Sequence, residues 1–330
     1  MAIFERKRSS AGLQPGLCAL WSTLAIIALA GPAEAQSAKA EAPSAKAERT
    51  PWGDPDLQGI WSIATITPFE RPSALAGKAQ LTEQEAAEAE KTFLTTQNQD
   101  RRDGAGTDAD VGRAYNDFWW DRGSKVVATR QTSLVVDPPD GRVPALTPEG
   151  QKRAAERAAR GYDSWQDRSL WERCITRGLP MIPGPYNNNY QILQTPTHVV
   201  ILHEMIHDAR IVPLDGRPHV GQHIRQWFGD SRGRWEGNTL VVDTKNFTDK
   251  VSFRGSTEGL HLVERFTRLD ADTVRYEFTI DDPATFTKKW TAAIPMARTD
   301  EQIYEYACHE GNYGMVNLLK GARVQEQGAK

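Results

Sequence analysis

The chain of 330 residues has little of several features that mark common protein classes. Positive charge is not in excess, because 40 Lys and Arg stand against 43 Asp and Glu, so no surface for nucleic acid is expected. The longest apolar run has about 15 residues, whereas a membrane-spanning helix needs about 20. These absences exclude a nucleic-acid-binding protein and a polytopic membrane protein. They leave a small molecule as the expected partner, with the oligomeric state open.

Residues 1–35 have the pattern of a Sec-type secretory signal peptide. A basic triplet at 6–8 precedes the apolar run that begins at Leu17, and 33–35 supply a small-x-small cleavage site. We expect cleavage after Ala35 and a periplasmic or secreted mature chain without stable membrane insertion.

Cysteine is scarce, with three in the chain, and Cys18 lies within the signal peptide. Cys174 and Cys308 are therefore the only cysteines of the expected mature chain. Two cysteines in an oxidising compartment commonly form a disulfide, and this bond is our prediction. The alternative is a reactive Cys308 thiolate activated by the adjacent His309.

The expected mature chain divides into a flexible tether at 36–50, one β-rich domain at 51–325 and a tail at 326–330. A helical insertion is expected at about 78–175. Its first helix follows the capping box of Thr82 and Glu85. The second begins at Thr147 and Pro148 and ends at Gly161.

After residue 186, short runs of β-branched and aromatic residues alternate with turns. This spacing predicts a mainly β (α+β) fold, either an antiparallel lipocalin-like barrel or a strongly curled meander, with helical insertions in the N-terminal half. The expected strands are 190–196, 198–205, 209–215, 223–229, 238–247, 260–269, 273–281, 286–296 and 303–308.

The segment His203-Glu204-Met205-Ile206-His207 matches the H-E-x-x-H pattern of zinc proteases. Zinc binding by this pattern requires a helix, which brings both imidazoles to one face. The surrounding Val and Ile favour a strand, in which the two histidines would lie about 13 Å apart. We therefore predict no metal site and no cofactor, and keep a zinc hydrolase as the least favoured alternative.

The same segment gathers an acid, a base and a cation. His207 is the candidate general acid or base, Glu204 or Asp208 its partner carboxylate, and Arg210 the group that stabilises negative charge. On one strand, Glu204, Asp208 and Arg210 would share a face. The cluster predicts an exported enzyme of lyase, isomerase or hydrolase type, acting on an apolar or aromatic substrate in a barrel cavity.

Further polar and aromatic residues are candidates for orienting a substrate. Two alternatives stay open: a periplasmic carrier that binds a small ligand without turnover, and an exposed hairpin whose charges form salt bridges. The candidate binding residues are Asn187, Asn188, Tyr190, Asp215, Arg217, His219, Trp235 and His309.

Five blocks at 186–196, 215–219, 229–247, 260–283 and 304–315 carry a resemblance to a family. Together they resemble a set of exported bacterial proteins with a lipocalin-like barrel character and no assigned activity. The resemblance extends over roughly residues 51–325 and implies a common secreted architecture. In addition, 59–61 resembles the Gly-x-Trp of the first strand of lipocalin-like barrels, which implies that Trp61 closes one barrel end.

Overall fold

The computed structural model describes residues 48–98, 100, 106–107, 116–161, 164–250 and 253–328, except for the side chain of His207. The expected signal peptide and all but the last three residues of the tether lie outside this range. No helix within it has the length and apolar character needed to cross a bilayer.

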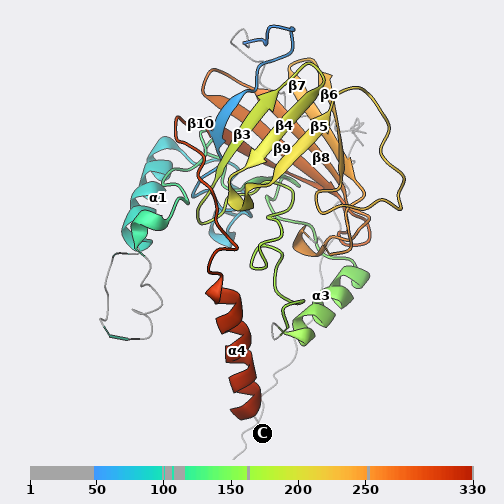
Figure 1. Ribbon diagram of the computed structural model, residues 1–330. Coiled ribbons are helices and arrows are strands. Elements are labelled where there is room, and N and C mark those ends of the chain that lie inside the picture. The colour runs from blue at the N-terminus through green and yellow to red at the C-terminus, as the bar shows by residue number, and fades with distance from the viewer. Residues whose placement is uncertain are drawn as a thin grey trace, which may run out of the picture. The chain divides into compact units, whose positions relative to one another are not determined.

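The fold is a nearly closed antiparallel barrel (Figure 1). Its strand order is β5-β4-β3-β1-β10-β9-β8-β7-β6, and the short β2 pairs with β10 off this path. The strands are β1 (Gly59–Ser62), β2 (Val135–Asp137), β3 (Asn189–Gln194), β4 (His198–His203), β5 (Ala209–Pro213), β6 (Asp230–Glu236), β7 (Thr239–Lys245), β8 (His261–Arg268), β9 (Thr273–Asp281) and β10 (Trp290–Arg298).

The two end strands of this order, β5 and β6, approach each other closely. A Cβ placed on Gly233 of β6 would lie 2.9 Å from Val212 on β5 and 2.6 Å from Leu214 just beyond it. Only glycine leaves room for this contact, because real Cβ atoms do not come so near to other side chains. Side-chain packing between the end strands therefore almost closes the barrel, and the predicted barrel is confirmed.

Alternation along the strands places large apolar side chains inside the barrel. On β9, Tyr276, Phe278 and Ile280 are completely buried, and the residues between them are partly exposed. Trp61 on β1 is also completely buried, and its Nε1 donates to the carbonyl of Leu57 at 2.9 Å. The inward face of the sheet is thus filled by side chains.

The two predicted helices are present, and each begins directly after its predicted N-cap residue. In α1 (Glu83–Thr96), Thr82 and Glu85 make the expected reciprocal capping box. α3 (Pro148–Arg160) begins after the side chain of Thr147 accepts from Gly150, and it ends at Gly161 with φ 68°. The described part of the chain also contains the short 3-10 helices η1 (Ser73–Leu75), η2 (Asp117–Trp119), η3 (Met205–His207) and η4 (Phe253–Gly255).

Several predicted elements are wrong. Segments 223–229 and 303–308 contain no strand, and β6 forms at 230–236, where none was expected. A helix, α4 (Tyr313–Gly328), occupies part of the expected domain end and tail. It begins where the side chain of Asn312 accepts from the backbone N–H of Met315 at 3.2 Å, the cap interaction that stabilises a helix start.

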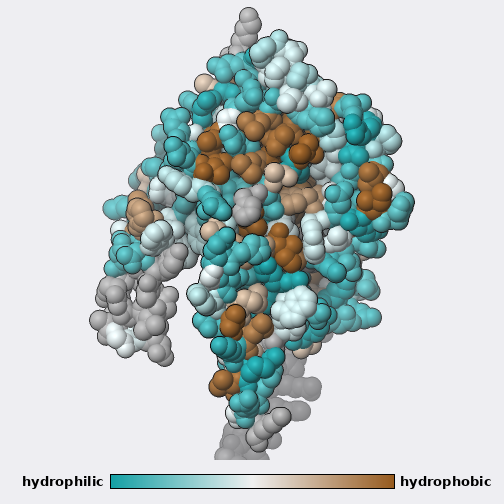
Figure 2. All heavy atoms as spheres, in the orientation of Figure 1, coloured by the Kyte–Doolittle hydropathy of each residue, from teal (hydrophilic) through white to brown (hydrophobic). Residues whose placement is uncertain are grey.

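The outer face of β3–β5 carries apolar side chains in contact with solvent. Leu193 is 46% exposed and Ile211 is 63% exposed, and their strands are neighbours through β4. A brown area covers these strands in Figure 2. Strand alternation here places apolar residues on both faces of the sheet.

Candidate functional site

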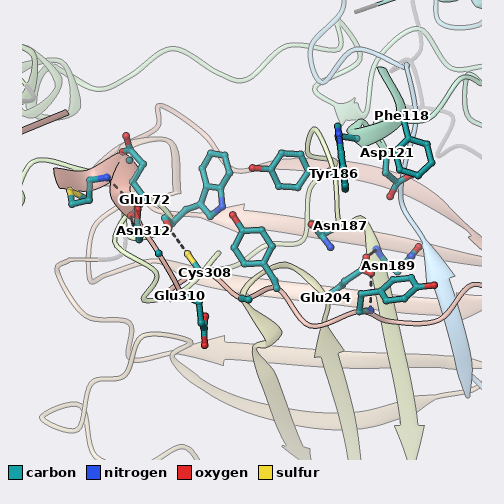
Figure 3. Close-up of a pocket in the computed structure, with 18 of the residues that line it drawn as sticks. Phe118, Asp121, Glu172, Tyr186, Asn187, Asn189, Glu204, Cys308, Glu310 and Asn312 are labelled. Atoms are coloured by element: carbon teal, nitrogen blue, oxygen red, sulfur yellow. Dashed lines mark hydrogen bonds between the residues drawn. The ribbon is translucent and has the colours of Figure 1, made fainter. Parts of the chain in front are cut away.

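A hollow of about 950 Å³ lies outside the barrel core, where the segment between β10 and α4 passes the ends of β3 and β4. Figure 1 shows the course of this segment, and Figure 3 shows side chains that line the hollow. We call it the acidic hollow. No Lys, Arg or His of the described chain lines it. Its carboxylates are Asp121, Glu172, Glu204, Glu301 and Glu310.

Glu204 lies immediately after β4 and is 3% exposed. Its carboxylate accepts from the backbone N–H of Asn189 at 3.2 Å and of Tyr304 at 3.4 Å. Burial raises the pKa of Glu204, and the nearby carboxylate of Asp121 raises it further. The two backbone hydrogen bonds only partly oppose this, so the protonated form is favoured relative to a carboxyl in water.

The carboxyl of Asp121 also has a raised pKa. Burial is the largest cause of its raised pKa, opposed by the backbone N–H of Asn188, which donates to the carboxylate at 3.3 Å. The negative charge of Glu301 raises the pKa further. In the described chain, neither Asp121, Glu204 nor Glu301 forms an ion pair with a cationic side chain. Three neighbouring carboxyls thus lack positive charge beside them.

Asn189, at the start of β3, adds an unsatisfied acceptor to the same end of the hollow. The residue is 3% exposed, and its Oδ1 is buried with no hydrogen-bond partner in the described structure. Its Nδ2 donates to Glu301 at 3.4 Å. Figure 3 shows Asn189, Asn187 and Glu204 side by side. A buried acceptor without a donor is costly, so a ligand N–H or O–H would stabilise it.

Aromatic rings form the walls of the acidic hollow. Tyr186 stacks on Tyr306, with centroids 6.2 Å apart, and lies 6.4 Å from Trp171. Phe118 and Trp119 form an edge-on pair at 5.3 Å and are 85% and 59% exposed. Aromatic faces carry partial negative charge, so they attract cations as well as apolar groups.

The predicted disulfide between Cys174 and Cys308 is present. It joins the segment carrying Trp171 to the segment carrying Tyr306, and Cys308 lies at the end of the hollow near Glu310 (Figure 3). Because Cys308 is bonded, it does not supply the reactive thiolate of the alternative hypothesis. The disulfide fixes one wall of the hollow against the other.

The H-E-x-x-H segment does not form a long helix. His203 ends β4, and residues 205–207 form the single turn η3, in which Ile206 has φ 63°. Inside the barrel His203 Nε2 shares a hydrogen bond with the hydroxyl of Tyr190, and burial lowers the pKa of His203 to about 3. The helical arrangement needed by a zinc protease is absent here, and the described residues contain no group of three metal-ligand side chains placed to hold a metal.

The expected shared face of Glu204, Asp208 and Arg210 is wrong. Glu204 and Asp208 lie in the turn on either side of η3, where the strand alternation is interrupted. Asp208 accepts from the hydroxyl of Thr176 at 2.8 Å and from the backbone N–H of Arg177 at 3.1 Å. Arg210, on β5, is buried inside the barrel. The fourth predicted catalytic side chain, that of His207, lies outside the described part.

Of the predicted binding residues, only Asn187 lines the acidic hollow with Glu204. Asn188 instead holds its own loop, accepting from the N–H of Gly184 at 2.7 Å and donating to the carbonyl of Asp121. Tyr190 lies inside the barrel beside His203.

The other predicted binding residues lie elsewhere. Asp215 and Arg217 form an exposed ion pair, and the ring nitrogens of His219 lie within hydrogen-bond distance of Asp243 at 2.8 Å and of Asp230 at 2.9 Å. Trp235 and His309 are likewise absent from the lining: Trp235 packs partly buried against the barrel core, and His309 is exposed.

Sequence reasoning missed Asp121, Asn189, Glu301, Tyr304 and Tyr306. The tyrosines were assigned to a strand, and Asp121 and Glu301 belong to segments without a recognisable motif. Asn189 was not selected from the amides around it. Only the concentration of amides and tyrosines at 186–190 pointed to this place.

Comparison of the chain with protein families, curated proteins and solved structures gives no match.

Proposed function

We propose that this protein binds a small organic cation, such as an amine or a quaternary ammonium compound, in the acidic hollow. One observation carries the proposal: Asp121, Glu204 and Glu301 lie together without a cationic partner in the described chain, between aromatic walls.

Electrostatics support a cationic occupant. The charge of Asp121 raises the pKa of Glu204, and the charge of Glu301 raises the pKa of Asp121, so these carboxylates repel when ionised. A bound positive charge would be attracted to them and would offset that repulsion. The rings of Tyr186, Tyr306 and Trp171 add cation–π attraction of about 0.5–2 kcal/mol each for a well-placed cation. The volume of about 950 Å³ is within the range of small-ligand sites.

The proposal includes export of the protein across the membrane. The signal-like segment 1–35 supports export to the periplasm or outside the cell, and the disulfide is compatible with an oxidising compartment. The protein would then act as an exported carrier of its ligand.

A second candidate is the acid–base enzyme expected from the sequence, now centred on the acidic hollow. The raised pKa of Glu204 and of Asp121 favours it, because a carboxyl that keeps its proton to higher pH can serve as a general acid. In this version Glu204 exchanges a proton with the bound molecule. The role of His207 stays a prediction.

The binding test uses benzyltrimethylammonium as the cationic probe and benzyl alcohol as its neutral counterpart, titrated by calorimetry. We expect the cation to bind, and we expect Glu204→Gln and Asp121→Asn each to weaken it about tenfold, the equivalent of 1.4 kcal/mol. Glu305→Gln is the matched control, because Glu305 is exposed and does not line the hollow. Equal binding of the two probes would contradict the proposal.

Turnover is tested separately, by incubating the protein with a mixture of amines and alcohols and analysing it by mass spectrometry. A carrier returns every bound compound unchanged. An enzyme yields a product, and Glu204→Gln abolishes its formation.

A further inference from the structure

A second hollow, of about 740 Å³, has the opposite charge. It lies between the end of α3, residues 165–182, residues 249–250 and residues 253–254, and Trp171 lines both hollows. We call it the basic hollow. Among the described residues, its lining contains two carboxylates, those of Asp167 and Asp249. Its cations are Arg157, Arg160, Arg168, Arg173, Arg177, Lys250 and Arg254.

Some of these cations are neutralised within the protein. Arg160 pairs with Asp167 at 3.1 Å, Arg168 lies 3.5 Å from Glu172, and Arg254 pairs with Glu70 at 2.9 Å.

Three other cationic side chains of the basic hollow are not neutralised in this way. Arg173, Arg177 and Lys250 form no ion pair with a carboxylate in the described ranges. The basic hollow therefore contains positive charge that the described fold itself does not compensate.

Stacking holds two of these guanidinium groups in place. Arg173 lies over the ring of Trp165, with its Cζ 4.8 Å from the centroid, and Arg177 lies over Trp171 at 5.3 Å. A guanidinium stacked on indole loses rotational freedom before any ligand arrives, while the N–H groups at its edge remain able to donate. Such a planar donor set matches the two oxygens of a carboxylate or phosphate.

Apolar side chains complete the basic hollow. Leu170, Leu179, Ile182 and Phe253 line it, and all of these except the buried Leu179 are partly exposed. Inorganic ions would leave this surface unused, whereas a ligand with an apolar body would bury it.

We propose that the basic hollow is a second binding site, which takes a small organic anion with an apolar body. Its oxyanion group contacts Arg173, Arg177 and Lys250, and its body packs on the apolar lining. This site goes beyond the cation site, and neither depends on the other.

The probe is 2-naphthoate, with 2-naphthamide as the uncharged counterpart of the same shape. Calorimetry measures affinity. Quenching of tryptophan fluorescence that is lost in Trp165→Phe locates the ligand, because Trp165 lines the basic hollow and does not line the acidic hollow. We expect naphthoate to bind at least tenfold more tightly than naphthamide, with the difference shrinking as salt is added.

The variants are Arg173→Gln and Lys250→Gln, each expected to weaken naphthoate about tenfold. Lys250 is exposed and its side chain forms no ion pair in the described structure, so its replacement tests binding without disturbing folding. Arg142→Gln is the charge-matched control, because Arg142 is exposed and lines neither hollow; it should leave affinity unchanged.

Equal affinity for the two probes, or unchanged naphthoate affinity in both variants, would overturn the proposal. The cation site is scored independently, since Glu204→Gln and saturating benzyltrimethylammonium should leave naphthoate affinity unaltered. Failure of the cation experiment would therefore not remove the anion site.

Discussion

Arg210 and Glu264 form an ion pair inside the barrel, where their side chains are 5% and 0% exposed. Arg210 Nη2 donates to Glu264 Oε1 at 3.1 Å, and the hydroxyl of Tyr276 donates to the same oxygen at 2.9 Å. The pair joins β5 to β8 through the interior of the sheet. This position gives Arg210 a structural role in place of the catalytic one that the sequence suggested.

Replacing one partner of this pair should strongly destabilise the barrel. Arg210→Met leaves the Glu264 carboxylate buried and uncompensated, which costs about 3–5 kcal/mol of unfolding free energy. Urea unfolding followed by circular dichroism measures the loss. The double variant Arg210→Met with Glu264→Leu should recover most of it, because no unpaired charge then remains. A loss below about 1 kcal/mol in the single variant would show that the pair contributes little.

The carboxyl of Glu204 should make stability fall as pH rises. Its pKa is higher in the folded protein than in the unfolded chain, where it is near the ordinary value of 4.5. The folded state therefore binds more protons between the two values, and the stabilisation present below pH 4.5 is lost as pH rises through the folded pKa.

The measurement is the unfolding free energy of Glu204→Gln minus that of the wild type, at a series of pH values. This difference should shift in favour of the variant as pH increases. Benzyltrimethylammonium should reduce the shift, because it is expected to bind the wild type about tenfold more tightly than the variant. A flat profile for Glu204→Gln would mean that the carboxyl is as easily ionised as in water.

Asp243 should show the opposite dependence. Burial opposes ionisation of its carboxyl, but hydrogen bonds from His261 at 2.7 Å and His219 at 2.8 Å outweigh burial and hold its pKa well below the ordinary value of 3.8. Its stabilisation is thus complete above that value and is lost only as pH falls through the lowered pKa. Asp243→Asn should cost about 2 kcal/mol at neutral pH. The deficit, measured by thermal unfolding, should shrink in strong acid; a constant deficit would contradict this account.

Reducing the disulfide should affect the acidic hollow first. The bond between Cys174 and Cys308 holds the segment that carries Tyr306 and Glu310, whereas the barrel strands pair without it. Reduction should remove benzyltrimethylammonium binding and lower stability by about 4–5 kcal/mol in the chain-entropy account, with the far-ultraviolet dichroism of the sheet retained. The double replacement of both cysteines by serine should behave like the reduced protein. Unchanged cation affinity after complete reduction would show that the acidic hollow binds cations without the disulfide.

The sequence predicted those parts of the fold in which one strong local signal decides the structure. Alternation along β8 and β9, and the caps at Thr82 and Thr147, are signals of this kind. β6 was missed because its inward positions include Ser231 and Gly233, which give no apolar alternation. Closure of the barrel requires a small residue at Gly233, whereas the alternating pattern of a strand predicts a large apolar residue at this inward position.

The candidate site was harder to predict, because it is assembled from separate segments. Asp121, Glu204 and Glu301 are far apart in the sequence and meet only through the fold and the disulfide. Counting alternate residues also failed between Glu204 and Arg210, because the left-handed φ of Ile206 reverses the chain within one turn. The periodicity of the sequence gives no sign of this change in chain direction.

The place of β1 in the sheet has a consequence for biosynthesis. As the first strand made, it lies between β3 and β10, and its Trp61 pairs with Arg298 near the end of the last strand. A nascent chain on the ribosome cannot finish the barrel until translation is nearly over. A chain truncated before Trp290 would lack β10, and β1, β2 and β9 would each lose a strand with which they pair. We therefore expect truncated chains to be cleaved readily by proteases.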